Sequence, residues 1–167
     1  RKVLGIKKPK DLVRRILERN GFLYGSAVLL RRDVFDMAGK FAEALPKGTD
    51  SDVYRRIILL GYDIYIIEKS MVDYHADSDD QMTLLDEKGI NRSIVGIKYK
   101  LSRYYELYRN YPLIKSNLYY LLANMYLKKF KSYKNYNCKQ LYKIYYFKSF
   151  CTYWLKIKAI IKYFKNL

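Results

Sequence analysis

The sequence predicts an α/β fold, a partial sheet with helices, followed by a mainly α-helical basic C-terminal region. Two observations lead to this prediction. Between Gly25 and Gln81, short apolar runs alternate with segments of helical periodicity. Beyond Gly96 the periodicity is helical throughout, and the charge becomes strongly positive. We therefore expect one domain over residues 1–96 and a helical extension over residues 97–167.

The charge is distributed unevenly along the chain. Residues 1–97 contain 17 Lys or Arg and 15 Asp or Glu, a net charge of +2, whereas residues 98–167 contain 16 Lys or Arg and one acid, a net charge of +15. Fifteen of the twenty tyrosines also lie in the second part. A chain of 167 residues is long enough to bury a sizeable core. The two parts are therefore interpreted separately.

The predicted elements of the first part are helices and short strands in alternation. Pro9 favours the start of a helix that ends at Asn20-Gly21, with one apolar face made by Leu12, Val13, Ile16 and Leu17. The run from Gly25 to Leu30 is short and apolar, as in a buried strand. Asp33 is suited to cap a short helix, and Gly39 is suited to its left-handed exit.

A second helix with an acidic start follows. Thr49 or Asp50 is expected to cap it, and Gly61 to close it, with Val53, Ile57 and Leu60 on one face. Residues 62–67 and 71–75 are predicted to form the next two strands.

The basic part is predicted to be helical over residues 97–109 and 113–130, with a break at Pro112. Leu118, Leu122, Met125 and Tyr126 share one face of the second helix. A linker is expected over residues 128–139, and a final helix from Gln140 to Lys165. Near its end, one side carries Tyr153, Ile157, Ile160, Ile161 and Phe164, and another carries Lys158, Lys162 and Lys165.

Several short motifs of the first part occur in an order that we recognise. They are Gly25-Ser26-Ala27, Arg31, Val34-Phe35, Gly39, Phe41, Asp50, Asp52, Arg55, Gly61-Tyr62 and His75. This ordered set resembles the acceptor-side half of the nucleotide-sugar glycosyltransferases of family 2, which share the GT-A fold. The resemblance covers about a third of the chain. It implies a GT-A-like sheet here, and an upstream donor-binding half of which this chain contains no part.

The resemblance implies an inverting transfer with Asp50 as the catalytic base. A carboxylate at a helix start is favoured in its ionised form and can accept a proton. On spacing alone, a simple helix cap explains Asp50 as well. The resemblance also implies that Ser26, Thr49 and Asp52 contact the acceptor, although Asp52 is equally placed to pair with an arginine one turn later. The family usually has an acid where this chain has Thr49, so that charge is absent.

A divalent metal, Mg²⁺ or Mn²⁺, is the implied cofactor and would be held mainly by the donor-binding half. His75, the only histidine, is implied to contact that metal or the diphosphate. The competing interpretation is a hydrogen-bonded structural histidine. The implied substrates are a nucleotide-sugar donor and a saccharide or lipid-linked acceptor of bacterial surface polysaccharide synthesis.

Other features bear on location and on alternative functions. Cys138 and Cys151 have no CxxC spacing, which favours reduced thiols in the cytoplasm. No run of eighteen apolar residues occurs, so a membrane-spanning helix is not expected. Residues 140–167 are predicted either to lie on the anionic inner face of a membrane or to pack on the catalytic domain. The alternatives to a transferase are a basic nucleic-acid-binding module and an inactive remnant. The sequence lacks the usual nucleic-acid-binding patterns, which argues against the first.

Overall fold

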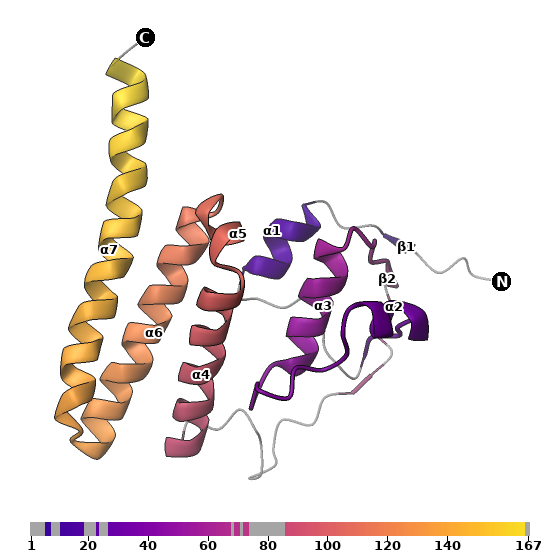
Figure 1. Ribbon diagram of the computed structural model, residues 1–167, viewed down its shortest axis with the longest axis horizontal. Coiled ribbons are helices and arrows are strands. Elements are labelled where there is room, and N and C mark those ends of the chain that lie inside the picture. The colour runs from indigo at the N-terminus through magenta and orange to yellow at the C-terminus, as the bar shows by residue number, and fades with distance from the viewer. Residues whose placement is uncertain are drawn as a thin grey trace. The chain divides into compact units, whose positions relative to one another are not determined.

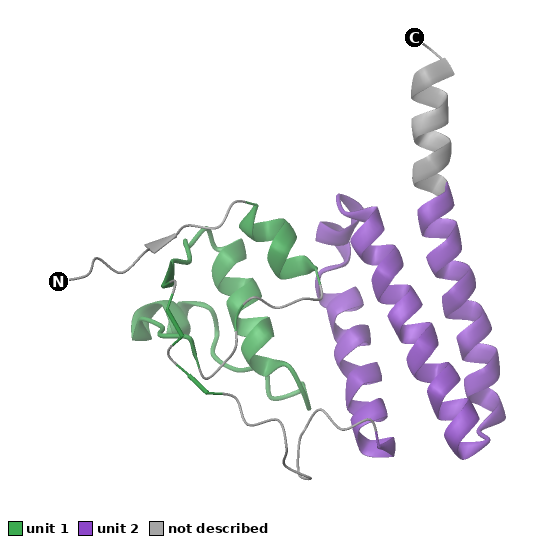
Figure 2. Cartoon of the chain, turned by 180° about the vertical axis from the view of Figure 1, so that it is seen from behind, with its two compact units in different colours: residues 1–81 green, residues 82–167 purple. Residues whose placement is uncertain are grey.

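The computed structural model describes the backbone of residues 6–7, 11–18, 23, 27–67, 69–70, 72–73 and 86–165, and the side chains of these residues except 6–7 and 155–165. The chain divides into two compact units, residues 1–81 and 82–167 (Figure 2). The boundary predicted between residues 96 and 97 lies inside helix α4, Glu87–Arg103. Each unit is described by itself below.

The predicted α/β class with a GT-A-like sheet is wrong for the residues that the structure describes, because helices dominate them. Strand structure there is confined to β1 (Ile6–Lys7) and β2 (Ile66–Ile67), which pair antiparallel with Ile6 opposite Ile67. Residues 28–30 and 72–73 have no regular secondary structure. Of the strand predicted over residues 62–67, only the last two residues form one.

The missing strands have a physical explanation. An extended segment becomes a strand only when a neighbour satisfies its backbone N–H and C=O groups. Within the described residues, the apolar run ending at Leu30 has no such neighbour. Leu29 is 99% exposed, so this run does not lie between two buried faces. An apolar run shows that a segment could be buried, but it does not supply a pairing partner.

The described part of unit 1 contains three helices, α1 (Leu12–Leu17), α2 (Arg32–Met37) and α3 (Thr49–Leu59). Three glycines with positive φ mark the ends of α2 and α3: Gly39 at 81°, Gly48 at 77° and Gly61 at 91°. The predicted left-handed exit at Gly39 and the predicted helix end at Gly61 are therefore confirmed. The core of the unit is formed by Ile16, Leu17, Val34, Ala38, Leu45, Val53, Tyr54, Ile57 and Ile58.

Unit 2 is helical and consists of α4, α5 (Tyr105–Arg109), α6 (Pro112–Tyr133) and α7 (Tyr136–Lys165), with α6 between α4 and α7 (Figure 1). The predicted helix break before Pro112 is confirmed. The linker predicted over residues 128–139 is wrong, because Lys134 and Asn135 alone separate the two long helices. Lys134 makes this turn with a positive φ of 51°.

The hairpin of α6 and α7 is held by buried apolar and hydroxyl groups. The predicted apolar face of α6, made of Leu118, Leu122, Met125 and Tyr126, is confirmed as buried. The buried hydroxyls of Ser116 and Ser149 each donate to the backbone carbonyl of the other residue, both at 2.9 Å. Within the described residues, no helix combines the length and apolar character needed to cross a membrane.

Candidate functional site

Helix α3 positions the two carboxylates that the sequence singles out. Gly48 adopts a left-handed conformation, which allows a sharp entry into the helix at Thr49. Asp50 lies in the first turn and is half-buried, and its carboxylate accepts a hydrogen bond from the backbone N–H of Ser51 at 2.7 Å. Among the described residues, Asp50 forms no salt bridge. The positive end of the helix dipole lies beside this carboxylate.

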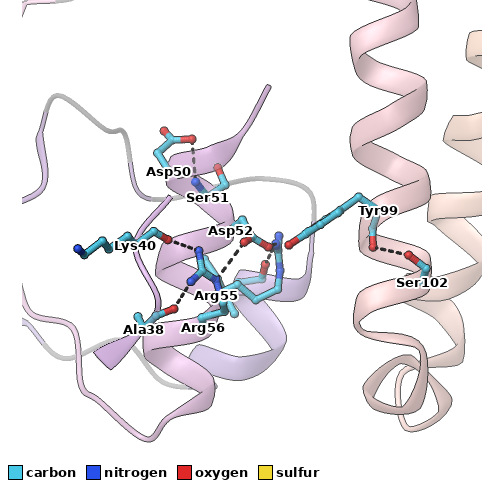
Figure 3. Close-up of polar contacts among 10 residues, drawn as sticks. Ala38, Lys40, Asp50, Ser51, Asp52, Arg55, Arg56, Tyr99 and Ser102 are labelled. Carbon is cyan, nitrogen blue, oxygen red and sulfur yellow. Dashed lines mark hydrogen bonds and ion pairs between the residues drawn. The ribbon is translucent and has the colours of Figure 1, made fainter. Parts of the chain in front are cut away.

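Asp52, two residues later, lies in a different environment. Only 1% of the residue is exposed. Its carboxylate accepts a hydrogen bond from Arg56 Nε at 3.0 Å and lies 3.8 Å from Arg55 Nη1. Figure 3 shows Asp52 directed toward these two guanidinium groups and Asp50 directed away from them. The predicted pairing of Asp52 with an arginine one turn later is confirmed for both arginines.

The two arginines connect α3 to the rest of unit 1. Arg56 donates hydrogen bonds to the backbone carbonyls of Ala38 and Lys40, on either side of the turn that follows α2 (Figure 3). Arg55 is buried and donates to the carbonyl of Ile16 in α1 at 3.4 Å. Asp52 is thus the shared anion of a cluster that fixes three helices. This arrangement assigns it a structural role, and its contact with an acceptor stays a prediction.

Tyr54 is a residue beside Asp50 that the sequence analysis missed. It is buried and follows Asp50 by one helical turn. Burial raises the pKa of the Tyr54 phenol, and the negative charge of Asp50 raises it further. The phenol therefore stays neutral near the candidate base. The i, i+4 spacing in the sequence would have been enough to indicate this neighbour.

The remaining predicted site residues are only partly placed. Thr49 is the first residue of α3 and is half-buried, adjacent to Asp50. Ser26 and His75 lie outside the described residues. Among the residues that are described, no group of three or more His, Cys, Asp or Glu side chains could hold a metal ion. The role of His75 as a metal ligand stays a prediction.

Comparison of the chain with protein-family models, with curated proteins and with solved structures gives no match. The assignment of a function therefore depends on the motifs and on the geometry around α3.

Proposed function

We propose that the chain is the acceptor-side part of an inverting nucleotide-sugar glycosyltransferase of bacterial surface polysaccharide synthesis, with Asp50 as its general base. The observation that supports this most is the contrast between the two carboxylates of α3. Asp52 is buried and paired with two arginines, whereas Asp50 is half-buried at the helix start and, within the described residues, unpaired with any cation. Only Asp50 is available to receive a proton.

The chemistry follows from this position. Asp50 takes the proton of an acceptor hydroxyl as the hydroxyl oxygen forms a bond to the anomeric carbon of the donor. The bond from that carbon to the diphosphate breaks at the same time, so that a nucleoside diphosphate leaves and the configuration inverts. Thr49, next to Asp50, is proposed to orient the acceptor with its hydroxyl, and Ser26 is proposed to assist. A divalent metal, proposed to be held by a donor-binding half and by His75, would neutralise charge on the diphosphate.

We further propose a cytoplasmic location at the inner face of the cell membrane, where a lipid-linked acceptor would be available. The two cysteines support the cytoplasmic part, because Cys138 is a buried free thiol and Cys151 is also unpaired.

The test requires the protein that contains this chain together with a donor-binding half. Release of nucleoside diphosphate would be measured for UDP-, GDP- and dTDP-sugars, with saccharide and lipid-linked acceptors. Asp50→Asn keeps the shape of the side chain but removes its basicity, so we expect turnover to fall by about 10²–10⁴-fold. The matched control is Asp36→Asn, in which the altered carboxylate is exposed on α2 and paired with Arg32 at 3.1 Å. Near-normal turnover in the Asp50 variant would refute the assignment.

A further inference from the structure

The side of α7 that faces away from α6 carries exposed aromatic side chains. Cys138, Tyr145 and Ser149 mark the side that packs on α6, because they are buried or contact residues of α6. Several aromatic residues on other sides are exposed, among them Phe147 at 65%. We call the exposed set the aromatic face; it consists of Tyr146, Phe147, Phe150, Tyr153 and Trp154, with Tyr146 at its edge, where the ring also contacts Tyr120 of α6. A face of this kind needs a partner, because isolated exposed apolar residues are common but contiguous ones are not.

The charges on the two helices of this hairpin are all positive. Neither α6 nor α7 contains an acidic residue, so their lysines cannot form ion pairs within the hairpin. Lys129 of α6 forms an ion pair with a residue outside the hairpin, because its Nζ lies 3.7 Å from the carboxylate of Glu87 in α4. Lys139, Lys143 and Lys148 of α7 are exposed. Their charges attract an anionic partner.

The ring contacts distinguish between two anionic partners. Single-stranded nucleic acid binds aromatic side chains by stacking bases on open ring faces. Here, the rings of Phe150 and Trp154 stack on each other, with centroids 6.0 Å apart and planes inclined by 13°. Tyr146 likewise packs against Tyr142, at 5.8 Å. Ring faces already in contact leave edges and outer faces exposed, which suits insertion among lipids better than intercalation between bases.

We propose that α7 lies in the plane of an anionic lipid surface, with the aromatic face inserted among the headgroups and the lysines bound to lipid phosphates. Helices with one apolar aromatic face and lysines beside it bind membranes in this orientation. Each lysine near an anionic surface strengthens binding by about fivefold, the equivalent of about 1 kcal/mol. This docking surface is independent of the proposed transferase chemistry, and it makes residues 146–154 the contact segment.

The test uses the full chain and its own fluorescence, because Trp154 is the only tryptophan. Vesicles of phosphatidylcholine alone and of phosphatidylcholine with phosphatidylglycerol would be mixed with the protein at low and high salt. We expect co-sedimentation with the anionic vesicles only, weakened by salt, and a shift of Trp154 emission to shorter wavelength as the indole leaves water. Binding to neutral vesicles alone, or no shift on binding, would overturn the proposal.

Two sets of variants separate insertion from charge attraction. Phe147→Ser with Phe150→Ser retains the tryptophan and should weaken binding to anionic vesicles by at least about tenfold. Its control is Leu29→Ser with Tyr65→Ser, which removes two exposed apolar side chains of unit 1. Circular dichroism would verify that the helix content of both variants is unchanged.

The charge variant replaces three lysines of α7, and its control replaces three exposed arginines of unit 1. The triple variant Lys139→Gln, Lys143→Gln and Lys148→Gln should weaken binding by about a hundredfold. The control Arg14→Gln, Arg31→Gln and Arg32→Gln changes the net charge equally and should have a small effect. Equal losses in the two would mean that the lysines of α7 have no special part in binding, which overturns the proposal. So would tighter binding to single-stranded or duplex DNA, or self-association abolished by the phenylalanine variant.

Discussion

Replacing Asp52 by Asn should destabilise unit 1 strongly. The substitution keeps the volume of the side chain and its ability to accept a hydrogen bond, but it removes the negative charge. Arg55 and Arg56 would then remain close together without their shared anion, 3% and 13% exposed in their side chains. Because both guanidinium groups are largely buried, water cannot compensate their positive charges. The loss is therefore an electrostatic effect rather than a packing defect.

The expected magnitude follows from the burial of the cluster. Breaking a buried ion pair by removing one partner costs about 3–5 kcal/mol. Small domains have a total unfolding free energy of roughly 5–15 kcal/mol, so this loss is a large fraction of it. An exposed pair such as that of Arg32 and Asp36 contributes only about 0.2–1 kcal/mol. Asp36→Asn is therefore the matched control for removing a carboxylate.

Hydrogen exchange measured by mass spectrometry on the full chain can detect this difference locally. A loss of about 3 kcal/mol should accelerate exchange of the α3 amides by about a hundredfold or more, if they exchange through opening of unit 1. The amides of α6 serve as an internal reference, because they belong to unit 2. If α3 exchanges at its original rate in the Asp52 variant, the cluster is not what holds unit 1 together.

Two further outcomes are expected. The folded-state pKa of Tyr54 lies above its ordinary value, so unit 1 keeps the corresponding stability below pH 10 and loses it as pH rises through the folded pKa. NMR titration of ¹³C-labelled tyrosine should show that the pKa of Tyr54 is lower in the Asp50→Asn variant than in the original protein but still above its ordinary value. An unchanged pKa would mean that the side chains of Tyr54 and Asp50 do not interact. Ser116→Ala should destabilise the hairpin by about 0.5–1.5 kcal/mol in urea denaturation, because it removes the buried hydrogen bond from the Ser116 hydroxyl to the carbonyl of Ser149. The double variant with Ser149→Ala should cost less than the sum of the single changes, and strict additivity would contradict the reciprocal pairing.

The helices could be predicted from the sequence because their signals are local. The face made by Leu118 and Leu122 repeats every three or four residues, and Pro112 marks a break that depends only on its own ring. The sheet could not be predicted in the same way, because pairing depends on residues far apart in the chain. The turn at Lys134 was missed for another reason: a lysine with positive φ gives no signal comparable to that of Gly39.

The candidate site was predictable in part. The spacing of Asp52 to the two following arginines indicated a structural pair, and the structure has it. The sequence could not show how deeply that pair is buried, because burial depends on α1 and on the turn after α2. This burial distinguishes the carboxylate of Asp52 from that of Asp50, and it leaves Asp50 as the candidate base.

The reciprocal serine bonds have a consequence for the register of the hairpin. Most positions of α6 and α7 are Tyr, Lys, Leu or Ile, so the two helices could slide past each other by a turn and still pack similar groups. A slip of four residues would place Pro112 or Tyr120 where Ser116 lies, and two buried hydroxyls would lose their partners. Each would cost about 1–3 kcal/mol. The serines therefore select one axial alignment of α6 and α7 over those displaced by a turn.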